Sequence, residues 1–238
     1  MHNKRVSTTI SVVILSLIAI AFLFPFAWMV ATSLKPTTEV FSLSPTGSRI
    51  AWDNYPSALN SIPFGRVVLN SFIVSLAGAA LVVVVSVLSA YAFARLRFKG
   101  RDHLFMLFLG TLVLPQEVLV IPLYIGMQRM GLVNSYFALI VPFAFGAFGA
   151  FLIRQFLMSL PLEFEEAARI DGCSDWKILT KILLPLLKAP ITVVGVFAFI
   201  DYWSAFLWPL IVVNDSSLAT IPLGLQMFSG ERGTDWGP

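Results

Sequence analysis

Charged residues are scarce in this sequence of 238 residues. They make up 12% of it, against about 25% in an average soluble protein. Hydrophobic residues make up 58%, and the mean hydropathy is +0.85. A soluble domain of this length would need more charge to cover its outside. The composition therefore argues against a soluble globular protein or a disordered chain, and it indicates an integral membrane protein.

Cysteine and histidine are almost missing. The single cysteine, Cys173, excludes an internal disulfide and a metal site built from several cysteines. The two histidines, His2 and His103, leave little for a histidine-based metal or catalytic centre. The sequence also has no HExxH pair and no GxSxG elbow. We therefore expect no metal site and no catalytic site, which argues against an intramembrane enzyme.

Long apolar runs are what the sequence does contain. A helix needs roughly 20 apolar residues to cross a hydrocarbon core about 30 Å thick. Five runs reach that length, and internal prolines are tolerated in such helices. The sequence therefore predicts an all-α polytopic transmembrane bundle, a single domain over 1–238, with spans at residues 10–31, 67–94, 104–127, 136–153 and 186–213.

The first run could also be read as a cleaved signal peptide, because it follows a short basic start. Its apolar stretch exceeds the roughly 7–15 residues of a signal-peptide core, and no small-x-small cleavage site follows. We therefore interpret residues 10–31 as a retained span.

Orientation follows from the lysines and arginines, which favour the cytoplasmic side of a membrane protein. With a cytoplasmic N-terminus, residues 154–185 lie inside, and the loops 32–66 and 214–238 lie outside. Eleven of the sixteen basic residues are then inside: Lys4, Arg5, Arg95, Arg97, Lys99, Arg101, Arg154, Arg169, Lys177, Lys181 and Lys188. This distribution predicts a multi-pass protein of a prokaryotic cell membrane with its N-terminus in the cytoplasm.

Small residues recur at intervals of four within two of the predicted spans. Lipid gives no hydrophobic drive for helices to associate, so small residues mark where backbones approach closely. We interpret them as helix contact faces, with chance recurrence as the alternative: Ser71, Ser75 and Ala79; Ser86, Ala90 and Ala94; Gly146 and Ala150.

Two acids, Glu117 and Asp201, fall within predicted spans. An ionised acid in the membrane costs at least a few kcal/mol, so it should face the bundle interior or a water path. One hypothesis is that they line a solute pathway. The alternative is a local role, since Glu117 follows Pro115 closely and would then cap a broken helix. The only lysine or arginine within a predicted span is Lys188, at the cytoplasmic start of 186–213, so proton coupling has no evident relay.

The predicted cytoplasmic segment 154–185 has a pattern of its own. Acids open a short helix after Pro161, and Gly172 suits its C-terminal cap. A second amphipathic helix starts at Asp175 and leads to Pro185. Such a helix beneath the membrane could be pressed by a cytoplasmic partner, and an ordinary amphipathic loop lying on lipid is the alternative.

At these residues the sequence resembles a known family. Glu166-Ala167-Ala168, then Gly172 after three residues, then Ile182-x-Leu184-Pro185 after nine more fit the EAA motif of binding-protein-dependent ABC importer permeases. The remainder is similar to the carbohydrate-uptake branch with the MetI-like fold, to which the smaller maltose-importer permease belongs. The shared segments are Ser33-Leu-Lys35-Pro36, Asp53-Asn54-Tyr55, Asn70-Ser71, Ala92-Phe-Ala-Arg95 and Phe206-Leu-Trp-Pro209-Leu210.

The resemblance implies three partners: a homologous second permease, a cytoplasmic ATPase dimer that holds ATP and Mg, and an external solute-binding protein. No cofactor is expected in this chain, and nucleic acid is not a partner. The residues implied in coupling to the ATPase are Glu163, Glu165, Glu166, Ala167, Ala168, Arg169, Asp171, Gly172, Leu184 and Pro185. The candidate pathway residues are Asn70, Glu117, Asp201, Tyr202, Trp203 and Ser204.

Two features depart from the family pattern. The branch often has an Asn and an acid after the tryptophan of the fifth span, where this chain has Ser204 and Ala205 after Trp203, with Asp201 just before. Members usually have six spans, and this sequence stops at Pro238 after five. We therefore expect a shortened sequence, with a genuine five-span chain as the alternative.

The expected function is therefore one half of the pathway of an ATP-driven sugar importer. A permease for glycerol phosphate derivatives is one alternative, and the absence of basic residues from the spans, apart from Lys188 at the end of one, weakly favours a neutral sugar. An ion-coupled secondary transporter is another, but it would predict internal pseudo-symmetry and paired charges in the membrane. No clear internal repeat is present.

Overall fold

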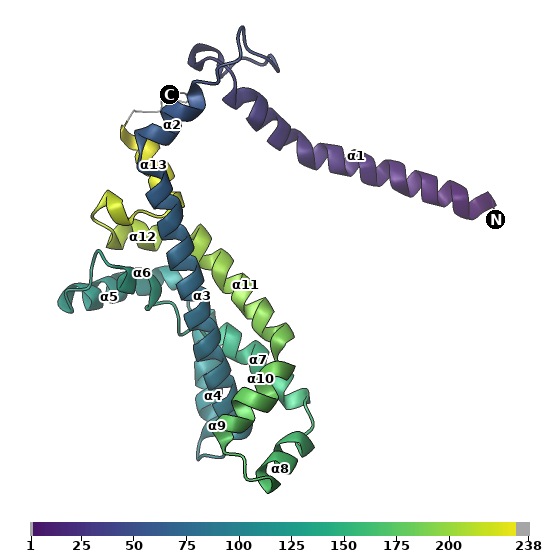
Figure 1. The fold of residues 1–238 in the computed structure, drawn as a ribbon, viewed down its shortest axis with the longest axis vertical. Helices are drawn as coiled ribbons and strands as arrows, with labels where there is room; N and C mark the ends of the chain where they lie inside the picture. The colour runs from purple at the N-terminus through teal and green to yellow at the C-terminus, as the bar shows by residue number, and fades with distance from the viewer. Residues whose placement is uncertain (1, 232–238) are drawn as a thin grey trace. The chain divides into compact units, whose positions relative to one another are not determined.

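The computed structural model describes the backbone of residues 2–231. Over these residues the chain consists of helices and connecting segments, with no β-strand, which confirms the all-α prediction. The helices form two compact units, residues 65–225 and a smaller unit made of residues 2–64 with 226–231. Each unit is described by itself, and the ribbon is drawn in Figure 1.

The smaller unit begins with α1 (His2–Ser33), which contains the predicted span 10–31. Residues Ser11–Ser33 are long and apolar enough to cross a membrane, and large apolar side chains such as Leu15 and Phe22 are exposed on it. A helix that is apolar all round is stable only in an apolar environment. The unit continues with η1 (Thr37–Glu39) and α2 (Asn54–Ser61).

Two of the short sequence motifs in this unit bind each other. The Asn54 side-chain amide donates hydrogen bonds of 2.9 Å to the backbone carbonyls of both Ser33 and Lys35. The Tyr55 hydroxyl lies 2.7 Å from the Ser33 hydroxyl. Lys35 is fully buried, donates to the Ser42 carbonyl and lies over the ring of Trp28. These contacts therefore hold the start of α2, and the segment that joins α1 to α2, against the end of α1.

The larger unit is built on α3 (Phe64–Arg95), with α7 (Ala147–Ser159) and α11 (Lys188–Ser204) against it (Figure 1). The predicted small residues of α3 and Ala150 of α7 lie mostly at these contacts, whereas Gly146 is exposed and precedes α7. Gly149 of α7 packs against Ser86 of α3 and Val194 of α11, and Gly78 of α3 packs against the ring of Tyr202. Buried positions on α3 include Ser71, Ser75, Ala79, Ser86 and Ala90.

The remaining helices are short. They are α4 (Arg101–Gly110), η2 (Thr111–Val113), α5 (Gln116–Arg129), α6 (Tyr136–Ile140), α8 (Glu163–Ile170), α9 (Asp175–Lys177), η3 (Ile178–Leu183), α10 (Leu184–Leu186), α12 (Leu207–Val212), η4 (Ser216–Leu218) and α13 (Ile221–Glu231). The segment 214–238, predicted as an external loop, thus contains a helix, and residues 232–238 lie outside the described part.

Three of the predicted spans are not continuous helices. Residues 104–127 are divided at Leu114 and Pro115, where the chain is extended and the helix axes differ by 101°. Proline disfavours a helical conformation in the residue before it, which explains the break. Residues 136–153 are interrupted between α6 and α7, and residues 186–213 between α11 and α12. Among the described residues, two helices are long enough to span, or up to five if each bent pair counts as one.

The breaks leave backbone carbonyls without a partner in the helix, and side chains donate hydrogen bonds to two of them. The Tyr202 hydroxyl donates to the Ile140 carbonyl at 2.5 Å, and the Trp208 indole N–H donates to the Ala138 carbonyl at 2.8 Å. Both carbonyls belong to α6, which ends far short of a membrane-spanning length. Interrupted helices at membrane depth are stable when neighbouring groups bond the freed backbone in this way.

The tight contact of α3 with α11 gives a first prediction. In Gly78→Ala the new methyl group would lie 2.5 Å from a ring carbon of Tyr202. Because an aromatic ring cannot bend away, we expect a loss of about 1–3 kcal/mol of unfolding free energy. The control is Gly126→Ala on α5, where no atom lies within 4 Å. Thermal unfolding of the two purified proteins in detergent should separate them, and equal stability would contradict this packing.

Candidate functional site

A cavity of about 460 Å³ opens within the larger unit. It lies among the C-terminal half of α11, the start of α12, the beginning of α5 and the segment that joins α6 to α7. Cavities of about 300–1,000 Å³ are usual for small-molecule sites. The breaks in the three predicted spans therefore meet at one hollow, because each interrupted helix contributes an end to its wall.

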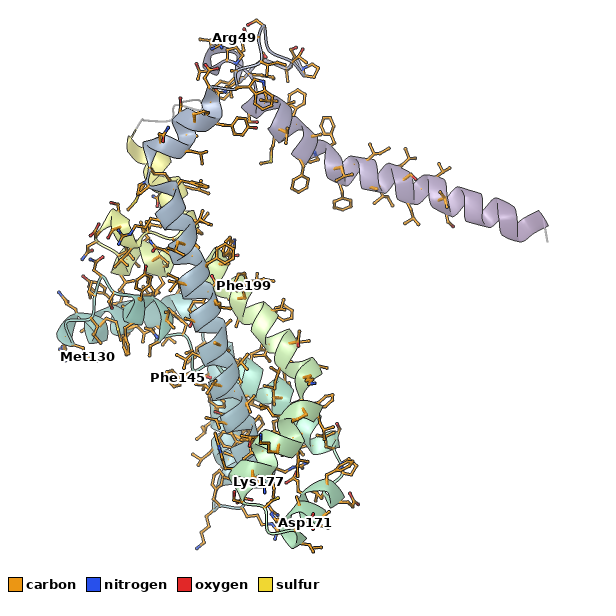
Figure 2. All side chains as sticks on the ribbon, viewed as in Figure 1. Arg49, Met130, Phe145, Asp171, Lys177 and Phe199 are labelled. Atoms are coloured by element: carbon orange, nitrogen blue, oxygen red, sulfur yellow. The ribbon has the colours of Figure 1, made fainter. Side chains whose placement is uncertain are left out.

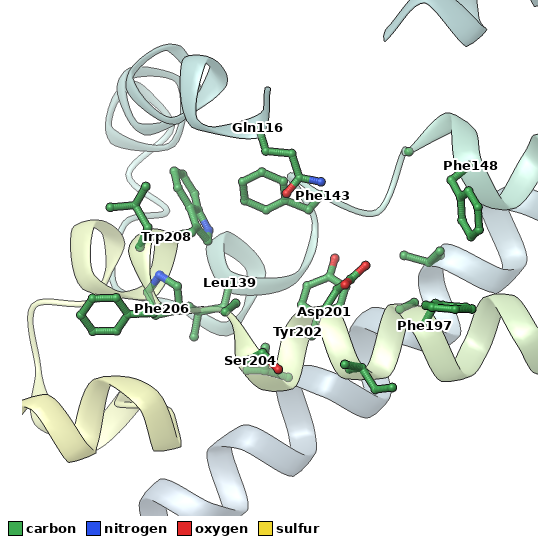
Figure 3. A pocket seen from close by; sticks show the side chains of 18 of the residues that line it. Gln116, Leu139, Phe143, Phe148, Phe197, Asp201, Tyr202, Ser204, Phe206 and Trp208 are labelled. Atoms are coloured by element: carbon green, nitrogen blue, oxygen red, sulfur yellow. The ribbon is translucent and has the colours of Figure 1, made fainter. Parts of the chain in front are cut away.

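Two carboxylates and an amide line this cavity. Asp201 comes from α11, while Gln116 and Glu117 come from the first turn of α5. The labelled side chains of Gln116, Asp201 and Tyr202 point into the same space in Figure 3. No lysine or arginine occurs among the lining residues that the structure describes. The cavity is thus acidic and rich in hydrogen-bond acceptors.

Aromatic rings form much of the remaining wall. Phe143 meets Trp208 edge to face at 5.4 Å between ring centroids, and Phe148 meets Phe197 at 6.0 Å in the same arrangement. All four residues line the cavity. The hydrogen bond from Trp208 to α6 fixes that ring in place. Large rigid rings beside a few polar groups are typical of sites that orient a small solute.

The structure brings four of the six candidate pathway residues together at the cavity: Glu117, Asp201, Tyr202 and Ser204. Glu117 also lies in the first turn of α5, as expected of an acid that caps a broken helix. Its two interpretations are therefore compatible. Whether any of these residues contacts a transported solute stays a prediction.

The other two candidates, Asn70 and Trp203, lie away from the cavity. Asn70 is buried, and its amide donates to the carbonyls of Ser217 and Ala219 while its oxygen accepts a bond from Tyr136. These bonds hold the start of α3 to the segment before α13. Trp203 packs between Phe72 and Phe199. Both therefore have structural contacts and do not line the cavity, and a position on the translocation pathway stays a prediction for them.

Several lining residues were not predicted. Gln116 and Phe143 line the cavity, yet their residue types alone gave no reason to select them. The available signal was Pro115, since a helix that restarts after a proline places its first-turn side chains at the break. Trp208 lies in the Phe206–Leu210 motif, which the sequence marked without indicating a cavity.

The second region of interest is α8, which lies at a different end of the larger unit. In Figure 2 the labelled Asp171 and Lys177 lie at one end of the unit, and Phe199 lies well away toward the other. Gly172 has a φ of +78°. The N–H of Cys173 donates to the Ala168 carbonyl, and that of Gly172 donates to the Arg169 carbonyl. This is a Schellman motif with glycine in the left-handed position.

The side chains of α8 divide between two faces. Glu165 and Ala168 are buried, and Ala168 enters an apolar cluster that includes Ala90, Leu157 and Leu183. The residues that point outward are Glu163, Glu166, Ala167, Arg169 and Ile170, the last with 86% of its surface exposed. Leu184 and Pro185 are also exposed. The outward face is thus acidic with apolar patches, as a protein-binding surface would be.

Arg169 is the exception to the acidic character of this face. Its guanidinium donates a 3.0 Å hydrogen bond to Asp175. That bond, more than any other effect, raises the pKa of Arg169. The pair bridges the turn around Gly172 and joins α8 to α9. Since both side chains are half exposed, its contribution to stability is small.

Glu165 does not share the position of its acidic neighbours. Its carboxylate is 2.5 Å from the Nε atom of Arg95, and only 3% of the side chain is exposed. We grouped Glu163, Glu165 and Glu166 as residues that couple to a partner, but in this structure Glu165 cannot present its carboxylate outward. Any role that it has in coupling must therefore act within the chain, while Glu163 and Glu166 remain accessible.

The geometry of Gly172 gives a second prediction. No atom lies within 4 Å of the position that a Cβ would take, so the constraint is the backbone conformation and not space. A β-branched residue in the left-handed region costs on the order of 1–2 kcal/mol. We expect Gly172→Val to increase hydrogen exchange across α8, and Gly172→Asn, which tolerates this conformation, to change it little. Equal exchange in both variants would contradict the capping role.

Comparison with known proteins agrees with these features. The family model described as binding-protein-dependent transport system inner membrane component matches residues 82–236. The sn-glycerol-3-phosphate transport system permease protein UgpE of Pectobacterium atrosepticum is 37% identical, over 99% of this chain and 87% of that protein. The lactose transport system permease protein LacG of Rhizobium radiobacter is 31% identical, over 99% of this chain and 86% of that protein.

A solved structure shows the same fold. A chain of a bacterial ABC transporter involved in the import of the acidic polysaccharide alginate superposes with a TM-score of 0.79 and 24% identity, over 95% of this chain and 80% of that one. The family match includes the segment 161–185 and the cavity wall formed by α11 and α12. The chain therefore belongs to the family of binding-protein-dependent transport system inner membrane components, the permease subunits of ABC importers, and has their MetI-like fold.

Proposed function

We propose that this permease subunit forms half of the translocation pathway for a neutral sugar or oligosaccharide. The observation that carries the proposal is the cavity, where two carboxylates and an amide face aromatic walls and no basic side chain is present among its described lining residues. Acceptor groups suit the hydroxyl groups of a sugar, and aromatic faces suit its apolar ring faces. The site itself needs no cofactor.

A phosphorylated solute is the second candidate, because the relative UgpE is named as a glycerol phosphate permease. The charge of the cavity argues against it. Glu117 and Asp201 would repel a phosphate in an environment where charges are weakly screened. Anion sites normally supply arginine, lysine or helix N-terminal N–H groups instead. The lactose permease LacG, at 31% identity, supports the neutral class.

Coupling to ATP is the second part of the proposal. The outward face of α8, with Glu163 and Glu166, would dock in a cleft of a cytoplasmic ATPase dimer, which binds the ATP and Mg. Closure of the dimer on ATP would then move α8 and shift the permease between two states. The chain would thus supply motion and a pathway but no catalytic group.

The orientation and remaining partners complete the proposal. The N-terminus lies in the cytoplasm, so that α8 is also cytoplasmic, in agreement with the excess of lysine and arginine in the segments assigned to that side. A homologous second permease encloses the other half of the pathway. An extracytoplasmic solute-binding protein delivers the sugar to the external loops.

The proposal is tested by uptake in cells. The gene is deleted and restored, and the uptake of radiolabelled lactose, maltose and glucose is compared with that of sn-glycerol 3-phosphate. We expect deletion to abolish ATP-dependent uptake of at least one neutral sugar and to leave the phosphate unchanged. Loss of phosphate uptake alone would favour the second candidate. Uptake that persists without ATP but collapses with the proton or sodium gradient would indicate a secondary transporter.

A further inference from the structure

Arg95, the last residue of α3, holds three elements together. Its Nε atom pairs with the carboxylate of Glu165 on α8 at 2.5 Å. Its Nη2 atom donates to the carbonyls of Leu157 at 2.8 Å and Leu160 at 3.3 Å, at the C-terminal end of α7. The side chain of Arg95 is 6% exposed and that of Glu165 is 3% exposed. One guanidinium group therefore joins α3, the end of α7 and α8.

The ion pair differs in kind from the apolar contact that α8 makes with the cluster beneath it. Ala168 contributes a small apolar surface to the cluster beneath the helix, and such a contact can slide. A close pair of buried opposite charges resists separation, because moving one charge away leaves the other buried and unpaired. A buried ion pair is also poor evidence of stability as such, because its desolvation offsets much of the attraction. A role in positioning α8 explains its presence better than a role in stability.

The helix α3, which ends at Arg95, also reaches the cavity, far from the ion pair. Gly78 lies about 25 Å from Arg95 along α3, at roughly 1.5 Å per residue, and there the helix is in close contact with the ring of Tyr202. Tyr202 lines the cavity beside Asp201 and bonds to the Ile140 carbonyl of α6. Because α3 is a continuous helix without proline between these points, it can transmit a displacement along its length.

We propose that the Arg95–Glu165 pair is the link through which movement of α8 reaches α3 and the cavity wall. Both are positioning residues, since they are buried where α3, α7 and α8 meet and do not line the cavity. The inference rests on the proposed docking of α8 on an ATPase. When α8 moves, the ion pair moves the end of α3 with it, and the contact of Gly78 with Tyr202 carries the displacement to α11. Without the bond, α8 would move over its apolar cluster and leave the cavity unchanged.

The test measures the opening of the cavity in the assembled complex. Cys173→Ser removes the only cysteine, and Ser204→Cys places a new one in the cavity lining. The complex is purified through a tag on this chain, and the rate of labelling by a water-soluble maleimide is measured with and without Mg-ATP and vanadate. In the parent chain, which carries Cys173→Ser and Ser204→Cys, we expect ATP to change the labelling rate by about 10-fold, a usual size for coupling between sites.

Glu165→Gln and Arg95→Met are then introduced, with Arg97→Gln and Lys99→Gln as exposed controls in the turn after α3. We expect the two link variants to copurify with the ATPase and hydrolyse ATP, but to lose most of the ATP effect on labelling. The exchange Arg95→Glu with Glu165→Arg should restore part of it. The controls should keep the full effect. A purely structural role would reduce the yield of complex without changing the ATP effect in the complexes that form.

Two failures are distinguishable. If no ATPase copurifies with the parent chain, the proposed function itself is wrong. If ATP changes the labelling rate in the parent and in Glu165→Gln to the same extent, only the link is wrong. Glu165→Gln keeps the shape of the side chain, so it decides the question if the arginine variants do not accumulate.

Discussion

Glu166→Lys is expected to abolish ATP-driven transport while the protein still inserts into the membrane. Glu166 is exposed on the outward face of α8, near the acidic residues Glu163 and Asp171. A cleft that receives this face should be basic, and reversing one charge at such an interface places like charges together, which costs several kcal/mol. We expect at least a tenfold loss in the amount of ATPase that copurifies, measured by quantitative immunoblotting of the tagged complex.

The matched control is Lys99→Glu. Lys99 is also exposed and is assigned to the cytoplasmic side, but it lies in the turn after α3 and not on α8. The control should retain the ATPase and transport at the level of the unaltered protein. Normal copurification and coupled uptake in Glu166→Lys would show that α8 is not the docking surface.

Asp201→Asn is expected to have the second large effect, on the solute and not on the ATPase. Asp201 lies on the cavity wall beside Tyr202 and opposite Gln116 (Figure 3). A hydrogen bond from a sugar hydroxyl to a carboxylate contributes about 1.5–3 kcal/mol, which corresponds to a roughly 10- to 150-fold loss of uptake when the charge is removed. ATPase association should be unaffected, because the cavity and α8 lie at separate ends of the unit.

Asp102→Asn is the matched control. The Asp102 carboxylate lies at the start of α4 with 71% of its side chain exposed, away from the cavity lining. It should transport sugar normally. Unchanged sugar uptake in Asp201→Asn would exclude a contact of the carboxylate with the sugar. A gain in uptake of sn-glycerol 3-phosphate without any loss of sugar uptake would show that the carboxylate acts only as a barrier to anions.

The sequence predicted the helices better than it predicted their breaks. The apolar runs and the four-residue spacing of Ser86 and Ala90 follow from membrane thickness and close packing, which are local properties of the chain. Hydropathy is an average over about 20 residues, so it cannot show where a helix stops inside an apolar run. The interruption between α6 and α7 contains no charged residue, and it is stabilised by Tyr202 and Trp208 from a distant segment.

The candidate site likewise contains residues that the sequence could identify and residues whose position depends on contacts with distant segments. Asp201 could be selected because a lone acid in an apolar run needs an interior position. Asn70 was selected from the Asn70-Ser71 segment that resembles the family, but its three hydrogen bonds connect it to residues almost 150 positions away or to α6. The sequence also could not show that the Glu165 side chain points into the protein. Three acids in four positions look alike in sequence, and only the approach of Arg95 makes one of them internal.

The most direct measurement is ATP-driven uptake in reconstituted vesicles. The complex purified through this chain is placed in liposomes with Mg-ATP enclosed and the solute-binding protein outside, and the accumulation of radiolabelled lactose, or of whichever neutral sugar the cell assay identifies, is followed. We predict accumulation that requires enclosed ATP, persists when ion gradients are abolished and is lost in Glu166→Lys. Accumulation without ATP, or in response to an imposed proton or sodium gradient alone, would contradict a permease driven by an ATPase through α8.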